Sequence, residues 1–381
     1  MFWTPIWHQA ITHMLSDGIL PGRKKTVCFK TKVYANGNNL RMRFCNIYGK
    51  KEYKIGAITV ISNGKFYDIT VNGDRSFSVP QNGFIYSDTI PLSLSYGDEI
   101  EIRIYYLSFI ADSNLIEEEA TVISGNVTHK RFDKLPMKKH IILKIIDNYN
   151  IIPAIDTIEL ETAERPKVIV AFGDSITAMN RWCKPLADRI HREFGSEFAF
   201  LNAGINGNCL IYETPGMLNK LFGEMGTARF KRDVLDIENL DCMIFGLGVN
   251  DVAYLNSKTK DIITFEKFTS AVTEMVNKLH ERNVRVTMQT ITPRLGTPKH
   301  IGDFTQEMEN LRLEINEWIR NADIFDYVFD AEKAVMEVKN GRMYYSDKYH
   351  QGDYLHPNKA GGLVLANAFD IYKLTNKSPN A

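Results

Sequence analysis

Four short apolar runs, separated by helical patterns, constrain the fold of the second half of this chain. The first run, Val168–Phe172, has the pattern of a strand that is buried on both faces of a sheet. Similar runs recur at 198–201, 242–247 and 285–289. Between and after them, two amphipathic patterns over 265–279 and 304–319 place apolar side chains on one helical face. This alternation predicts an α/β domain with a parallel sheet covered on both sides.

The first half of the chain follows a different pattern, in which apolar and polar residues alternate. The alternation starts at residue 26 and recurs in the pieces 40–44, 58–62, 65–71, 76–79, 89–95 and 99–107. Asn-Gly pairs at Asn63, Asn72 and Asn82 mark turns between several of these pieces. Short strands at this spacing predict an all-β sandwich. The later piece Thr157–Leu160 either completes this sandwich or leads out of it.

The length of the chain indicates two domains, because 381 residues exceed the usual size of one compact core. We expect a β-sandwich domain over residues 1–150. Its first 21 residues carry Trp3 and Trp7 and are predicted to form an arm that packs on a domain surface. The second domain is expected over residues 167–381, with the boundary between about Asn148 and Lys167.

The charge composition argues against two classes of partner. The chain has 46 basic and 46 acidic residues and no block of like charge, so we expect neither nucleic acid nor a membrane surface as a partner. The longest apolar runs have the length of a strand, which argues against a membrane-spanning helix. The first residues lack a basic segment followed by an apolar core. We therefore expect a cytoplasmic protein, although a trimmed secreted chain would look the same.

The cysteines give no sign of a metal site. They are odd in number and irregularly spaced, at Cys28, Cys45, Cys183, Cys209 and Cys242. Without a C-x-x-C motif, they indicate free thiols in a reducing compartment. We therefore expect a protein without metal or cofactor.

A serine follows the first apolar strand directly. Gly173-Asp174-Ser175 turns sharply after Phe172, and a helical pattern follows from about Arg181. The carboxyl end of a strand is where α/β sheets place reactive groups. A helix start also supplies backbone N–H donors and a positive dipole end, which suit a developing oxyanion. An ordinary helix cap is the alternative interpretation of these three residues.

Three further segments, 202–208, 246–251 and 352–358, follow later strands or precede the last helix. With the serine they contain the groups that acyl transfer needs. A serine hydroxyl becomes a nucleophile when an imidazole accepts its proton, and a carboxylate orients that imidazole. Asp353 and His356 are three residues apart, so both side chains can face the same way. Taken singly, the segments are typical of a tight turn, a helix cap and a surface turn; together they favour a catalytic site.

The four segments resemble the sequence blocks of the SGNH hydrolases, also called GDSL esterases. The matching pieces are Gly173–Ile176, Asn202–Asn208, Gly248–Asp251 and Asp353–Pro357. The resemblance implies that Ser175 is the nucleophile, that His356 is the base and that Asp353 orients His356. It also implies an oxyanion hole formed by the backbone N–H groups of Ser175 and Gly207 and by the side-chain amide of Asn250. Two neighbouring aspartates, Asp174 and Asp251, are expected to brace loops.

The resemblance further implies a three-layer, flavodoxin-like sheet domain. A jelly-roll-like sandwich ahead of it is similar to the two-domain carbohydrate acetylesterases, and segments 229–234 and 355–362 resemble members that act on acylated carbohydrates. The implied activity is removal of short acyl groups, above all O-acetyl, from carbohydrates such as oligosaccharides derived from plant polysaccharides. One alternative is a lipase or thioesterase that acts on longer acyl esters. A second is a carbohydrate-binding protein with an inert hydrolase half.

Overall fold

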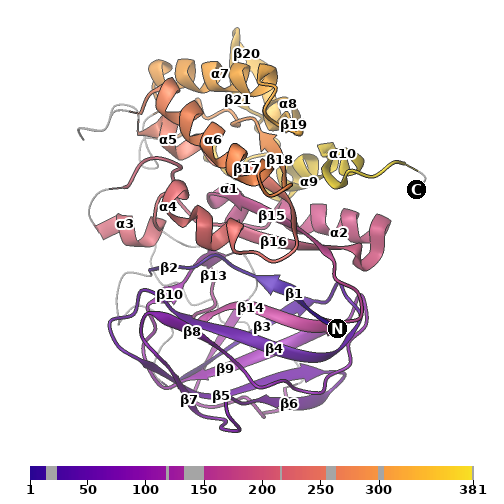
Figure 1. The fold of residues 1–381 in the computed structure, drawn as a ribbon. Helices are drawn as coiled ribbons and strands as arrows, with labels where there is room; N and C mark the ends of the chain where they lie inside the picture. The colour runs from indigo at the N-terminus through magenta and orange to yellow at the C-terminus, as the bar shows by residue number, and fades with distance from the viewer. Residues whose placement is uncertain are drawn as a thin grey trace. The chain divides into compact units, whose positions relative to one another are not determined.

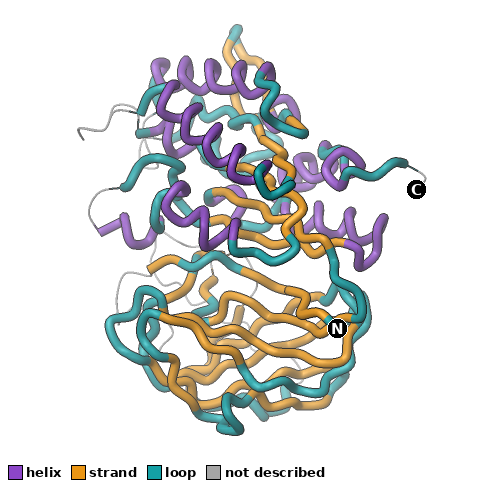
Figure 2. The backbone as a smooth tube through the Cα atoms, in the orientation of Figure 1, coloured by secondary structure: helices purple, strands orange, loops and turns teal. Residues whose placement is uncertain are grey.

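The computed structural model describes residues 1–13, 24–116, 120–132, 150–214, 217–254, 263–298 and 304–379. The chain divides into two compact units. The first contains residues 1–166 and 194–201, and the second contains residues 167–193 and 202–381. In Figures 1 and 2 the first unit consists mainly of strands, whereas helices and strands alternate in the second.

Strands dominate the first unit. They are β1 (Phe2–His8), β2 (Thr12–His13), β3 (Lys25–Lys32), β4 (Gly37–Asn46), β5 (Tyr53–Ser62), β6 (Lys65–Ile69), β7 (Phe77–Val79), β8 (Gly83–Tyr86), β9 (Glu99–Tyr106), β10 (Asp112–Ser113), β11 (Leu115–Ile116), β12 (Ala120–Ser124), β13 (Asn150–Ile151) and β14 (Ile155–Thr162). One sheet has the order β1-β14-β4-β8 and the other the order β12-β3-β9-β5-β6, with β7 paired to β5. Successive strands β3, β4 and β5 alternate between the two sheets, as they do in jelly rolls.

Apolar side chains from both sheets form one core. Leu40, Met42 and Phe44 of β4 are fully buried in it, and so are Ile100 and Ile102 of β9. Because side chains alternate across a strand, these positions are the inward-facing half of each strand. The all-β sandwich predicted from the alternation is therefore confirmed.

Two segments of the first unit differ from the sequence prediction, and a third decides between two alternatives that the sequence left open. Residues 2–8 form strand β1, which pairs with β14, rather than an arm. The reason is Trp7, which is 5% exposed and packs on Phe29 with 5.5 Å between ring centroids. The piece Thr157–Leu160 lies in β14 and completes the sandwich, whereas residues 89–95 form isolated bridges at Ile90 and Leu94.

In the second unit the elements alternate along the chain. They are β15 (Lys167–Gly173), α1 (Ser175–Ala178), α2 (Cys183–Phe194), a 3₁₀ turn (Gly195–Glu197), β16 (Phe198–Gly204), α3 (Met217–Phe222), α4 (Gly226–Phe230), the π-helical turn η2 (Lys231–Leu235), β17 (Leu240–Gly246), α5 (Val249–Ala253), α6 (Phe265–His280), β18 (Arg285–Gln289), α7 (Gln306–Asn321), β19 (Tyr327–Phe329), α8 (Ala331–Val335), β20 (Met336–Lys339), β21 (Arg342–Tyr345), α9 (Lys359–Ala368) and α10 (Ile371–Thr375). The four apolar runs of the sequence are β15, β16, β17 and β18.

The central sheet has the order β16-β15-β17-β18-β19, and the pairs from β15 to β19 are parallel. Helices cover both faces (Figure 1): α2, α9 and α10 lie on one side, and α4, α6 and α7 on the other. On the first side, Trp182 stacks on Phe369 with ring centroids 5.4 Å apart. The predicted three-layer α/β domain is confirmed.

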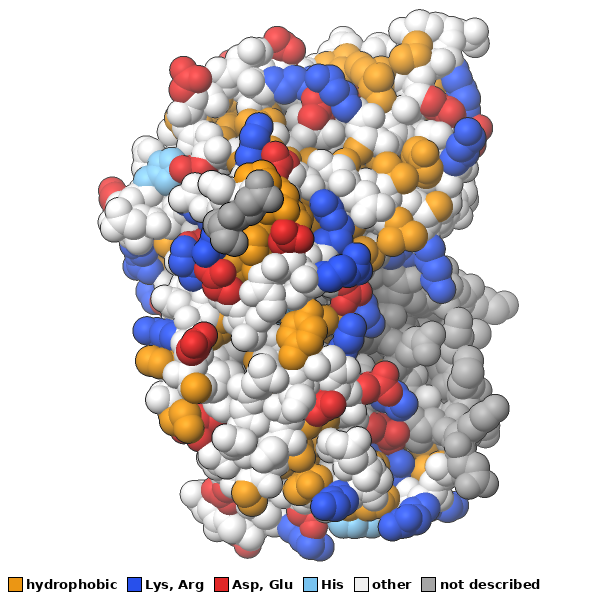
Figure 3. All heavy atoms as spheres, turned by 90° about the vertical axis from the view of Figure 1, so that its right-hand side faces the viewer, with side chains coloured by type: hydrophobic (Ala, Val, Ile, Leu, Met, Phe, Trp, Pro, Cys, Tyr) orange, Lys and Arg blue, Asp and Glu red, His pale blue; other side chains and the backbone are white. Residues whose placement is uncertain are grey.

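Three further features are the surface charge, the cysteines and the apolarity of the helices. In Figure 3, basic and acidic side chains are interspersed over the face shown. All five cysteines are buried, and no disulfide links them. None of the helices in the described ranges combines the length and the apolarity that a membrane crossing requires.

Candidate active site

Ser175 lies at the carboxyl end of β15, at the first residue of α1. Asp174 caps this helix, because its carboxylate accepts a hydrogen bond from the backbone N–H of Ile176 at 2.9 Å. The helix that the sequence predicts from about Arg181 is α2, which begins at Cys183, and α1 is an additional short helix that begins at Ser175 itself. Ser175 is 5% exposed. A cap followed by a buried serine fixes the hydroxyl at the strand end.

The structure joins Ser175, His356 and Asp353 by two hydrogen bonds. Ser175 Oγ lies 2.8 Å from His356 Nε2. On the other edge of the imidazole, Nδ1 lies 2.7 Å from Asp353 Oδ2. Residues 181 positions apart in the chain therefore form one continuous chain of hydrogen bonds, with the imidazole between hydroxyl and carboxylate.

A tight turn, rather than a helical turn, positions the Asp353 carboxylate. Oδ1 accepts the backbone N–H groups of Leu355 at 3.0 Å and His356 at 2.9 Å. Tyr354, between Asp353 and Leu355, has φ +54°, which is a left-handed backbone conformation. Gln351, which the sequence analysis missed, donates its Nε2–H to Oδ2 at 3.0 Å. No pattern in the sequence marks this contact, since it depends on the geometry of the turn.

These hydrogen bonds keep the Asp353 carboxyl ionised. Burial alone would raise its pKa, but the hydrogen bond and the charge of His356 outweigh burial, so the pKa lies well below the usual range. A carboxylate that stays negative can hold the proton of Nδ1 in place and stabilise an imidazolium. Nε2 is then the nitrogen that can accept the Ser175 hydroxyl proton.

The three predicted oxyanion donors lie on the described segments that follow β15, β16 and β17. Gly207 has φ +71°, and a side chain there would meet the Phe222 ring at 2.4 Å, so the position requires glycine. Within the described residues, the backbone N–H groups of Ser175 and Gly207 make no hydrogen bond. The amide of Asn250 donates one N–H to the carbonyl oxygen of Asn208 at 3.0 Å. Its second N–H has no protein partner within the same ranges.

Asp174 and Asp251 brace loops, as the sequence analysis expected. Asp251 accepts the backbone N–H groups of Leu210 at 2.8 Å and Ile211 at 2.9 Å, which fixes the loop after β16. Burial raises the pKa of Asp174 to about 7 and that of Asp251 to about 6. Each carboxyl therefore takes up a proton at a higher pH in the folded chain than in the unfolded chain.

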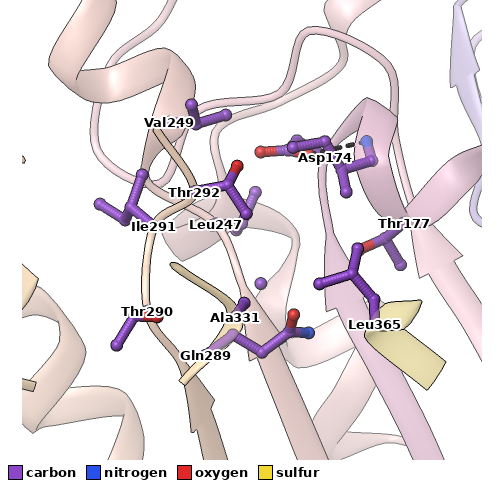
Figure 4. A pocket seen from close by; sticks show the side chains of 12 residues that line it. Asp174, Thr177, Leu247, Val249, Gln289, Thr290, Ile291, Thr292, Ala331 and Leu365 are labelled. Carbon is purple, nitrogen blue, oxygen red and sulfur yellow. Dashed lines mark hydrogen bonds between the residues drawn. The ribbon is translucent and has the colours of Figure 1, made fainter. Parts of the chain in front are cut away.

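A cavity lies beside the strand ends (Figure 4). It is lined by Asp174, Ile176, Thr177, Gly246, Leu247, Val249, Gln289, Thr290, Ile291, Thr292, Ala331 and Leu365. Two polar atoms, Gln289 Nε2 and Thr292 Oγ1, are buried and make no hydrogen bond with the described residues. Buried polar atoms are nearly always paired, so the cavity suits a small polar molecule such as water. Neither Ser175 nor His356 lines it, so we do not assign the ester to this cavity.

Over the described ranges, no three or more His, Cys, Asp or Glu side chains are grouped so as to hold a metal ion. The polar groups around Ser175 bond to one another and to backbone groups instead.

The fold and this set of residues define a GDSL-type hydrolase. The sequence profile of the GDSL-like lipase/acylhydrolase family matches residues 171–362, and the chain belongs to this family. The match spans β16 to β19 and all five predicted site residues.

Several solved structures resemble the chain. One is a GDSL-like lipase from Bacteroides thetaiotaomicron (17% identity, 54% of this chain and 87% of that chain, TM-score 0.40). Another is an acetyl xylan esterase from Geobacillus stearothermophilus (16% identity, 56% and 97%, TM-score 0.43). A third is an aryl esterase from M. smegmatis (18% identity, 55% and 99%, TM-score 0.40). Among curated proteins, no sequence matches.

Proposed function

We propose that the chain is a serine esterase in which Ser175, His356 and Asp353 form the catalytic triad. The observation that carries the proposal is the pair of hydrogen bonds, 2.8 Å and 2.7 Å long, that connects the three side chains. His356 Nε2 accepts the hydroxyl proton while Ser175 Oγ attacks the ester carbonyl. The imidazolium then donates that proton to the leaving alcohol, and a water molecule attacks the acyl-serine by the reverse route.

The oxyanion of the tetrahedral intermediate needs donors that are already in place. The N–H groups of Ser175 and Gly207 and the Asn250 amide fill this role, since each has an N–H that no described residue uses. Donors held by the fold do not have to reorient when charge develops on the carbonyl oxygen.

We further propose that the acyl group is short, most often acetyl, and that the alcohol is a carbohydrate. The short acyl group rests on the sequence resemblance to two-domain carbohydrate acetylesterases. The carbohydrate part rests on the sequence resemblance of segments 229–234 and 355–362 to members that act on acylated sugars.

A chain-length series tests the substrate class. We expect kcat/KM to be highest for p-nitrophenyl acetate and to fall for butyrate and octanoate, and we expect release of acetate from acetylated xylooligosaccharides. A higher kcat/KM on octanoate would instead identify a lipase or thioesterase. An inert protein would hydrolyse none of these esters.

A further inference from the structure

A buried arginine connects the segments that carry the proposed oxyanion donors. Arg229 of α4 is completely buried, and its guanidinium lies 4.0 Å from the centroid of the Phe172 ring. Its charge is balanced by Asp233, whose Oδ2 lies 3.0 Å from Nη1. The π-helical turn η2 places Asp233 at this distance, four residues further along the chain. Burying a guanidinium requires both a counter-charge and hydrogen bonds.

Three further hydrogen bonds of Arg229 lead to two strand ends and one loop. Nη2 donates to the carbonyl oxygen of Gly173 at 2.9 Å, two residues before Ser175. Nη1 donates to the carbonyl oxygen of Ala203 at 2.9 Å, at the end of β16. Nε donates to Asn208 Oδ1 at 2.9 Å, next to Gly207. One planar group therefore holds the segments of two proposed donors.

Asn208 extends this connection to the third donor. Its carbonyl oxygen accepts the Asn250 amide at 3.0 Å. Its own amide nitrogen donates to the carbonyl oxygens of Phe222 at 2.8 Å and Glu224 at 2.7 Å, which fixes its orientation. The chain of contacts thus runs from Gly173 through Arg229 and Asn208 to Asn250.

We propose that Arg229 is a positioning residue for the oxyanion hole: it sets the spacing of the Ser175 and Gly207 N–H groups and, through Asn208, of the Asn250 amide. This inference rests on the proposed esterase function. Displacement of a catalytic group by about 1 Å is enough to lower a rate about 10²-fold. The hydrogen bonds of Arg229 described above lead to Asp233, to two backbone carbonyl groups and to Asn208, and none of these is a triad side chain.

The substitution Arg229→Lys separates charge from geometry. Lysine keeps the positive charge that Asp233 needs, but an ammonium group cannot reach three acceptors in the planar arrangement of a guanidinium. The matched control is Arg312→Lys. Arg312 is equally buried and is paired with Glu309 and Glu332, and its hydrogen bonds go to these two carboxylates and to a carbonyl oxygen outside the three donor segments.

We expect both variants to lose thermal stability, whereas only Arg229→Lys loses turnover. For p-nitrophenyl acetate, kcat should fall about 10²-fold with little change in KM, as for loss of one preorganised donor. Affinity for an arylboronic acid, which forms a tetrahedral adduct with serine, should fall in parallel. The pH profile should keep its shape, because the triad is intact. Wild-type kcat in Arg229→Lys, or an equal loss in Arg312→Lys, would overturn the proposal.

Asn208→Ala serves if Arg229→Lys does not fold. It removes the Oδ1 acceptor of Arg229, together with the two amide hydrogen bonds of Asn208, and leaves Arg229 and the Asn208 carbonyl in place. A fall in kcat supports the proposal, and an unchanged kcat contradicts it.

Labelling by an organophosphonate ester separates this inference from the proposed function. If wild-type Ser175 is not labelled, the esterase proposal fails; if wild type and Arg229→Lys are labelled at equal rates, only the role of Arg229 fails.

Discussion

Asp353→Asn should abolish most of the turnover while leaving the fold intact. The asparagine carbonyl can take the place of Oδ1 and keep the backbone hydrogen bonds from Leu355 and His356. Its NH₂ group then faces His356 Nδ1 across the 2.7 Å contact. Two N–H donors cannot share that contact, so the imidazole moves its proton to Nε2. Gln351 can turn its amide and accept a hydrogen bond from the new NH₂ group.

In that tautomer Nε2 can no longer accept the proton of Ser175, whose Oγ lies 2.8 Å away. Loss of the correct tautomer lowers kcat about 10⁴-fold. At 1.36 kcal/mol for each factor of ten, this corresponds to about 5.4 kcal/mol of transition-state stabilisation. The assay is steady-state hydrolysis of p-nitrophenyl acetate, with circular dichroism melts to show that the variant is folded.

Asp347→Asn is the matched control. Asp347 and His350 have the same i, i+3 spacing, but their Oδ1–Nε2 distance is 3.4 Å and Asp347 is 59% exposed. We expect this variant to keep the wild-type kcat. Wild-type turnover in Asp353→Asn, or an equal loss in Asp347→Asn, would refute the reasoning about the tautomer.

Three further predictions concern glycine, pH and a buried ion pair. Gly207→Ala should lower kcat and stability, because the added carbon would lie 2.4 Å from the Phe222 ring. The control is Gly195→Ala: Gly195 has a similar φ, +60°, but no neighbour within 4 Å of the added carbon, so this variant should keep its kcat. Burial raises the pKa of Asp174 to about 7, so below that pH the folded chain binds a proton that the unfolded chain does not hold. The stability of the folded chain should therefore fall as pH rises from about 4 to 7. The melting temperatures of Asp174→Asn at pH 5 and 8 should differ less than those of wild type. Arg312→Met leaves buried Glu309 without its cation and leaves Glu332 paired with Arg320 alone, so the free energy of unfolding in urea should fall by about 3–5 kcal/mol. A fall below about 1 kcal/mol would contradict this account of the buried ion pair.

The sheet architecture of both units followed from local patterns. The apolar run 168–172 lies in β15, because a strand covered on both faces buries apolar side chains on both. The segment 285–289 forms β18, in which the apolar residues are Val286 and Met288. The alternation of 40–44 likewise became the inward face of β4. Residues 89–95 show the limit of this reasoning. They alternate in the same way, but they form only two isolated bridges, because strand pairing depends on partners that are distant in sequence.

In the candidate site, too, local sequence patterns could be predicted, whereas contacts between distant parts of the chain could not. The residue types of the proposed triad follow from the chemistry of acyl transfer. Their order in the chain was taken from the resemblance to the SGNH hydrolases, because the chemistry itself allows several orders. The parts that could not be predicted are contacts between side chains and distant backbone. Gln351 on Asp353 and Arg229 on the Gly173 carbonyl are examples. The start of α1 at Ser175 also escaped prediction, because a four-residue helix is too short to show a periodic pattern.

Covalent labelling tests the central claim, that Ser175 is a nucleophile activated by His356, most directly. The protein is incubated with an organophosphonate ester, its intact mass is measured, and the adduct is located by peptide mapping. We expect one adduct for each chain, on the peptide that contains Ser175, together with complete loss of esterase activity. Ser175→Ala should show neither adduct nor turnover. An adduct on another residue, or a fully active Ser175→Ala protein, would contradict the account.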